Sequence, residues 1–124
     1  MMFQGLRTVI YRIPAENIKQ ATDWYAKVLG KAPYFEESFY VGFNVGGFEL
    51  GLDPSEGKVI RGDNIQAYWG VQNIQETLSL CLKLGATTDS EIREVGGNIK
   101  VATVRDPFGN LLGLIENPNF KIET

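Results

Sequence analysis

The sequence predicts an α+β fold made of two copies of one βαβββ unit. Residues 47–52 and 109–114 both read G-x-x-L-G-L. The helix-like segments at residues 17–30 and 73–85 also align with each other. Because the two matches occur in the same order with similar segments between them, they indicate an internal repeat.

Each half opens with a strand and continues with a helix. The expected opening strands, residues 6–13 and 65–71, are rich in β-branched and aromatic residues. The helix of the first half has an apolar stripe opposite a charged face, as in a helix that lies on a sheet. Three short strands should follow each helix. We place them at about 33–37, 39–45 and 48–53, and at about 88–94, 98–105 and 110–116.

Both helices have recognisable ends. Asn17 and Asn73 stand before the helices, and each has Gln or Glu three residues later, which is the pattern of a capping box. Gly30 and Gly85 follow the helices, where a left-handed residue is expected.

The joints between strands carry turn residues. Gly46-Gly47 predicts a two-residue hairpin, and Asp106-Pro107-Phe108-Gly109 predicts a β-turn. Residues 54–63, with two glycines and several charges, are expected to link the two halves.

Composition narrows the functional classes. The 124 residues are 44% hydrophobic and 22% charged, which is typical of a globular protein, and no stretch reaches the ~18 apolar residues of a membrane span. The net charge is −3 with scattered basic residues, so we expect neither nucleic acid nor membrane as a partner. Cys81 has no second cysteine to pair with, and no secretion signal is recognisable, which favours a cytoplasmic location.

The chain contains no histidine. Histidine is the commonest metal ligand and the commonest general base at neutral pH. Its absence excludes Ser-His-Asp and Cys-His catalytic arrangements, and one cysteine cannot build a multi-thiolate metal site.

The repeat resembles the vicinal oxygen chelate superfamily, which groups glyoxalases, bleomycin resistance proteins and extradiol dioxygenases. The residues that carry the resemblance are the segment from Asp23-Trp24-Tyr25 to Val28-Leu29-Gly30 and the segment Asp106-Pro107-Phe108-Gly109-Asn110. The resemblance runs from about Leu6 to Pro118. It implies a single domain over residues 1–124, with units at about 6–53 and 64–118.

In that superfamily the mixed sheets curl around a concave pocket and the helices lie outside. The resemblance also implies a homodimer, and whether the units pair within one chain or exchange between chains stays open.

The metal ligands of that superfamily have no equivalent here. By the resemblance, the four ligand positions fall on Thr8, Gly51, Gln66 and Gly113. Glycine offers no side chain, and a hydroxyl and an amide are weak neutral donors. A shift of two residues would place Glu49 at the second position, which still gives only one carboxylate. We therefore expect no metal and no other cofactor.

Strand alternation assigns candidate ligand-binding residues to the pocket face. We select Thr8, Arg12, Glu49, Gln66 and Tyr68. Arg12 either contacts an anion, as the resemblance to glutathione-linked lyases implies, or pairs with a surface carboxylate. Glu49 is either a general base, an ion-pair partner of Arg12 or an edge-strand carboxylate. Gln66 could bond a ligand carbonyl or a neighbouring strand, and Tyr68 could stack on a ligand or fill the cavity.

Three functions remain open. The first is metal-independent binding of a small molecule in the concavity of the sheet, as in bleomycin resistance proteins. The second is a metal-independent lyase or isomerase that uses Glu49 as base and Arg12 to stabilise negative charge. The third is a non-catalytic structural or regulatory dimer. The scarcity of acid-base groups favours the first over a catalytic role, and the sequence assigns no catalytic residue.

Overall fold

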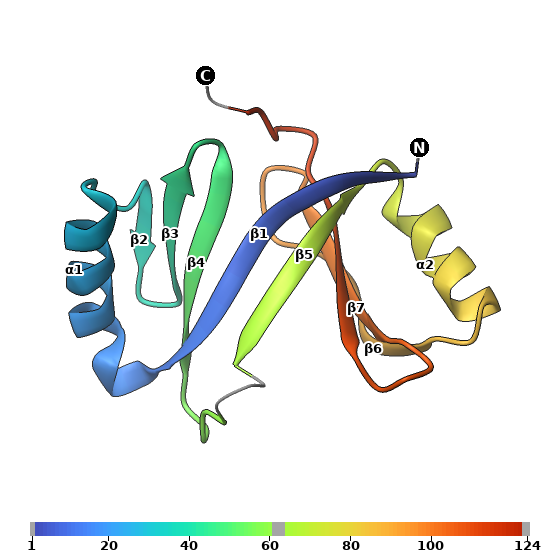
Figure 1. Cartoon of the computed structure of the whole chain (residues 1–124), viewed down its shortest axis with the longest axis horizontal. Helices are drawn as coiled ribbons and strands as arrows, with labels where there is room; N and C mark the ends of the chain where they lie inside the picture. Colours follow the sequence, from blue (N-terminus) through green and yellow to red (C-terminus); the bar gives the residue numbers. More distant parts are fainter. Residues whose placement is uncertain (1, 61–63, 123–124) are drawn as a thin grey trace. The chain divides into compact units, whose positions relative to one another are not determined.

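A computed structural model describes residues 2–60 and 64–122. These residues form eight strands, two α-helices and one 3₁₀ turn (Figure 1). Their bounds are β1 Phe3–Pro14, η1 Ala15–Asn17, α1 Ile18–Leu29, β2 Phe35–Glu37, β3 Tyr40–Val45, β4 Phe48–Ser55, β5 Ile65–Val71, α2 Ile74–Lys83, β6 Thr87–Glu94, β7 Lys100–Arg105 and β8 Leu111–Glu116. The predicted order, βαβββ followed by βαβββ, is confirmed.

The chain forms two compact units. The N-terminal unit contains Thr8–Gln66 together with Ile122. The C-terminal unit contains the start of the chain through Arg7 together with Ala67–Lys121. Strand β1 therefore contributes its first residues to the C-terminal unit and the rest to the N-terminal unit.

The sheet of the N-terminal unit has the strand order β2-β3-β4-β1. β1 runs parallel to β4, whereas β2, β3 and β4 are antiparallel neighbours. Helix α1 lies on one side of these strands (Figure 1). Among the described residues of this unit, no helix covers the opposite face of the sheet.

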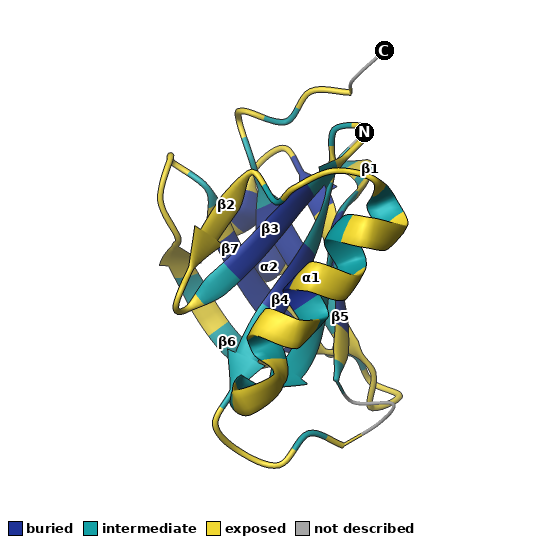
Figure 2. Cartoon of the chain, turned by 90° about the vertical axis from the view of Figure 1, so that its left-hand side faces the viewer, coloured by how far each residue is buried: buried dark blue, intermediate teal, exposed yellow. Residues whose placement is uncertain are grey.

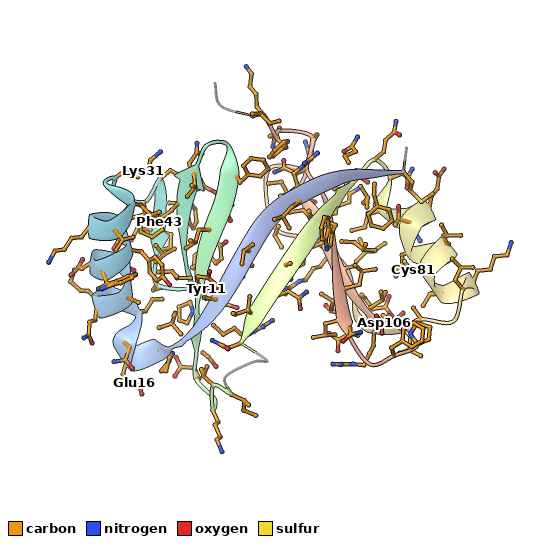
Figure 3. All side chains as sticks on the ribbon, viewed as in Figure 1. Tyr11, Glu16, Lys31, Phe43, Cys81 and Asp106 are labelled. Atoms are coloured by element: carbon orange, nitrogen blue, oxygen red, sulfur yellow. The ribbon has the colours of Figure 1, made fainter. Side chains whose placement is uncertain are left out.

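The core of the N-terminal unit lies between this sheet and α1. Val41, Phe43 and Leu52 are buried there, and Ile18 and Leu29 of the helix pack against them. Figure 2 shows buried strands behind a helix whose outer surface is exposed, and Figure 3 labels Phe43 beside α1. Because side chains alternate along a strand, the residues between these core positions face away from α1.

The C-terminal unit repeats this design, with the strand order β5-β8-β7-β6. β5 is parallel to β8, and the other pairs are antiparallel. Ile74 and Leu78 of α2 pack on Val104 and Leu114 of the sheet. The two units together give the mixed α+β architecture that the repeat predicts.

The strand register supports the alignment of the two halves. Ile10 pairs with Gly51 between β1 and β4, and Tyr68 pairs with Gly113 between β5 and β8. Ile10 follows Thr8 by two residues, and Tyr68 follows Gln66 by two. The equivalence of Thr8 with Gln66, and of the two glycines, therefore holds in the structure.

The helix caps agree with the prediction for one helix and differ for the other. Asn73 accepts a hydrogen bond from the N–H of Glu76 at 3.0 Å, as expected of a cap. The side chain of Asn17 makes no capping bond, because the 3₁₀ turn before α1 gives this residue a ψ of 1° instead of an extended conformation. Gly30 and Gly85 both have positive φ, as predicted.

The turns form where the sequence placed them. Gly46 and Gly47 have φ of 64° and 97°, the sign that a type I′ hairpin requires. The N–H of Gly109 donates to the carbonyl of Asp106 at 3.1 Å, which closes the predicted β-turn. Figure 3 labels Asp106 at this end of the C-terminal unit.

The predicted linker begins later than expected. β4 continues through Ser55 because Pro54 and Ser55 pair with the end of β1. Residues 61–63 of that linker lie outside the described residues. None of the helices in the described ranges has the length and apolar character needed to cross a membrane.

Candidate functional site

A carboxylate held by two phenols lies on the face of the N-terminal sheet opposite α1. Glu49 of β4 accepts a hydrogen bond from the hydroxyl of Tyr34 on Oε1 and from the hydroxyl of Tyr40 on Oε2. Tyr34 precedes β2 and Tyr40 opens β3, so three segments of the chain meet at one carboxylate. We call Glu49, Tyr34 and Tyr40 the carboxylate cluster.

Both phenols remain protonated at neutral pH. Burial raises the pKa of Tyr40 far above its ordinary value, and the charge of Glu49 and the hydrogen bond to it raise the pKa further. Burial and the same carboxylate also raise the pKa of Tyr34. The two hydroxyls are therefore donors, and Glu49 is their acceptor.

Two glycines make room for the tyrosine rings. Gly42 and Gly51 are paired between β3 and β4. A Cβ at Gly42 would lie 3.1 Å from Cε1 of Tyr34, and a Cβ at Gly51 would overlap the hydroxyl of Tyr40. The bare backbone at these positions lets both rings lie on the sheet and reach Glu49.

Exposed aromatic rings border the carboxylate cluster. The ring of Phe35 lies 6.3 Å from that of Tyr40 and 5.9 Å from that of Phe39, between centroids. Phe39 is 66% exposed and Tyr34 is 62% exposed. A carboxylate beside accessible aromatic surface can receive a molecule that has both a hydrogen-bond donor and an apolar part.

Three of the predicted site residues lie on the paired strands β1 and β4. Thr8 is the register neighbour of Glu49, and Arg12 is the neighbour of Asp53. The alternative ion pair between Glu49 and Arg12 does not form, since no basic group of the described residues lies within 4.0 Å of Glu49. The contacts of Glu49 go instead to the two tyrosines, which the sequence analysis did not select.

The other two predicted residues come from β5. Gln66 is 3% exposed and belongs to the N-terminal unit. Tyr68 is 7% exposed and belongs to the C-terminal unit, where it pairs with Gly113. The ligand-binding role of all five residues stays a prediction.

The residues at the four positions where the superfamily has its metal ligands are poorly suited to bind a metal ion. The donors there are the hydroxyl of Thr8 and the amide of Gln66, and the two glycines supply none. At Gly51, the ring of Tyr40 fills the space that a ligating side chain would need. Within residues 2–60 and 64–122, no three Cys, Asp or Glu side chains gather in a way that could hold a metal.

Comparisons by sequence give no match, either to a protein-family model or to a curated protein. Comparison by structure does. A glyoxalase/bleomycin resistance protein/dioxygenase superfamily member from Vibrio splendidus superposes with a TM-score of 0.65 at 18% identity, covering 90% of this chain and 99% of that one. The chain has the glyoxalase/bleomycin resistance fold.

Two further structures share this fold. A hypothetical protein from Bacillus halodurans has a TM-score of 0.74 at 20% identity, with coverage of 96% of this chain and 97% of the other. The Mn(II)-bound glyoxalase from Novosphingobium aromaticivorans has a TM-score of 0.71 at 15% identity. The match covers 99% of this chain and 42% of that glyoxalase, so this chain corresponds to less than half of it.

Proposed function

We propose that this protein binds a small molecule without a metal, on the face of the N-terminal sheet opposite α1. The observation that carries the proposal is the carboxylate cluster, in which Tyr34 and Tyr40 fix the orientation of Glu49. A fixed polar group beside apolar surface is a common feature of small-molecule sites. The glyoxalase/bleomycin resistance fold of the chain is consistent with such a role.

The carboxylate cluster favours a ligand that carries an N–H or O–H donor. One lone pair on each oxygen of Glu49 is used by a phenol, and the remaining lone pairs can accept from a ligand. The exposed rings of Phe35 and Phe39 would contact the apolar part of the same molecule, and an ammonium group would also gain a cation–π contact. We therefore propose small aromatic amines as the first ligand class to test.

A binding role suits Glu49 better than a general-base role. A general base must have its lone pair directed at the substrate proton. A lone pair remains on each oxygen, but the groups bonded to Glu49 among the described residues are two phenols with raised pKa values, which are poor proton donors at neutral pH. The structure therefore supports the lyase or isomerase alternative less well. Steady turnover of a bound ligand, lost in Glu49→Gln, would reverse this preference.

Isothermal titration with benzylamine tests the proposal. We expect saturable binding that chelator leaves unchanged and that Glu49→Gln weakens at least tenfold. Benzyl alcohol, which lacks the charge, should bind more weakly. Glu36→Gln is the matched control, because Glu36 is an exposed carboxylate on β2 that pairs with core Val41 and so points to the other face. Equal affinity in wild type and Glu49→Gln, or no binding of either probe, would refute the proposal.

A further inference from the structure

The C-terminal unit contains a pocket that the candidate site does not use. Its volume is about 450 Å³, within the range of small-molecule sites. It lies where the parallel strands β5 and β8 end, and it is lined by Gln4, Arg7, Gln72, Glu116, Asn117 and Phe120, among others. All of these residues belong to the C-terminal unit.

Arg7 is held in place within this pocket. Its Cζ lies 3.7 Å from the centroid of the Phe120 ring. The guanidinium also lies against bare backbone, since a Cβ at Gly70 would be 2.7 Å from its Nε. These contacts fix the plane of the guanidinium before any ligand arrives, which lowers the entropic cost of binding.

Among the described residues, no neighbour neutralises the charge of Arg7. Its Nη1 donates to the carbonyl of Leu6 at 3.2 Å, and no carboxylate of the described residues lies within 4.0 Å. Burial lowers the pKa of the guanidinium, which still stays charged at neutral pH. A guanidinium has five N–H donors, so most of them remain available to an oxyanion.

Glu116 supplies the opposite charge in the same pocket. Its Oε1 accepts a hydrogen bond at 2.9 Å from the N–H of Ile74, the first residue of α2. Glu116 pairs in register with Lys100 of β7. Both are described residues, yet their side chains form no ion pair with each other. Oε2 of Glu116 can therefore accept from a ligand.

We propose that this pocket binds a small zwitterion, namely a free amino acid or a related amino carboxylate. Arg7 binds the carboxylate through paired N–H donors, and Glu116 accepts from the ammonium group. The amides of Gln4, Gln72 and Asn117 can donate or accept beside them. A single anion fits less well, because Glu116 repels it, and a single cation is repelled by Arg7.

Isothermal titration of the full chain with a panel of free amino acids tests this. We expect at least one to bind, and acetate or methylammonium alone to bind at least tenfold more weakly. Arg7→Gln should weaken the binding at least tenfold. Arg93→Gln is the matched control, since Arg93 is an exposed arginine of β6 outside the pocket.

Two further variants separate the proposal from its competitors. Glu116→Gln keeps an oxygen for the N–H of Ile74 but should weaken the binding by losing the charge. If acetate binds as tightly as the amino acids and Glu116→Gln has no effect, the pocket is an anion site and the zwitterion assignment is wrong. The proposal fails if no amino acid binds, or if Arg7→Gln lowers the melting temperature without weakening the binding. Arg7 would then have only a structural role, through its contact with Phe120.

The proposed function and this pocket can fail independently. Glu49→Gln should leave amino acid binding unchanged, and Arg7→Gln should leave benzylamine binding unchanged. Loss of both affinities in either variant would contradict the assignment of two sites.

Discussion

The hydroxyl of Tyr40 occupies the space that a side chain at Gly51 would need. The ring of Tyr40 crosses β4 at this glycine and reaches Oε2 of Glu49. Where the superfamily resemblance places a metal ligand, this chain therefore has a protein hydrogen bond.

Gly51→Ala should destabilise the protein by about 1–3 kcal/mol, the cost typical of an overpacked site. The added methyl must displace Tyr40 and so break its bond to Glu49. Urea unfolding measures the change. Gly57→Ala is the control, because a Cβ there meets no atom within 4 Å. Equal losses in the two variants would show that Tyr40 is not fixed at Gly51.

Asn73→Ala should cost about 1 kcal/mol of unfolding free energy, because it removes the cap of α2. Asn17→Ala should cost much less, since the side chain of Asn17 makes no capping bond to α1. Urea unfolding of both variants checks the contrast, and a larger loss in Asn17→Ala would contradict it.

Asp106 should make the turn between β7 and β8 sensitive to acid. Hydrogen bonds to its carboxylate from Asn110 and the backbone lower the pKa of Asp106 below its ordinary value. A lowered pKa stabilises the fold at neutral pH, and this contribution is lost as the pH falls from the unfolded pKa through the folded one.

The melting temperature of Asp106→Ala, measured from pH 7 to about pH 3, tests this expectation. We expect the difference from wild type to be largest at neutral pH and to shrink on acidification. A difference that stays constant over this range would show that the carboxylate charge does not contribute.

Tyr40 should give the opposite pH dependence. The pKa of Tyr40 is raised in the folded state. The contribution of its hydroxyl to the stability of the fold is therefore complete below the ordinary tyrosine pKa of ~10, and it is lost as the pH rises above that value. The advantage of wild type over Tyr40→Phe in melting temperature should therefore shrink above about pH 10. An advantage independent of pH would mean that the hydroxyl proton does not matter.

The protein should form a homodimer, as the sequence analysis expects. Helix α2 and its end carry exposed Leu80, Leu82 and Leu84, an apolar surface that a second copy can cover. Light scattering at micromolar concentration should give twice the chain mass of 13.8 kDa. A mass of 13.8 kDa would exclude the dimer.

The fold was predictable because its signals are local. The Gly-Gly hairpin and the cap at Asn73 each act within a few residues, and both appear in the structure as expected. The repeated hexapeptide lies on equivalent strands of the two units. The predicted cap at Asn17 does not form, because a 3₁₀ turn precedes α1. The residues of that turn carry no pattern that predicts it.

The site was predictable only in part. Strand alternation placed Glu49 on the face opposite α1, as the structure has it, but its partners depend on the pairing of β3 with β4. The two-residue turn at Gly46-Gly47 fixes that register and sets Gly42 opposite Gly51. Gly42 lies two residues after Tyr40 and opposite Gly51, so this pairing leaves bare backbone on which a ring can lie. The direction of the Tyr34 and Tyr40 side chains depends on packing that no local pattern encodes.

Strand β1 has a consequence for how the chain folds during synthesis. The C-terminal unit takes strand residues, through Arg7, from the segment that precedes the N-terminal unit, and Phe3 packs in its core. A ribosome makes residues 67–121 after residues 8–66, so this unit must recruit a segment that was made well before them. Contacts between residues so distant in sequence slow folding. A fragment that starts at Ala67 should consequently be unable to complete its own core.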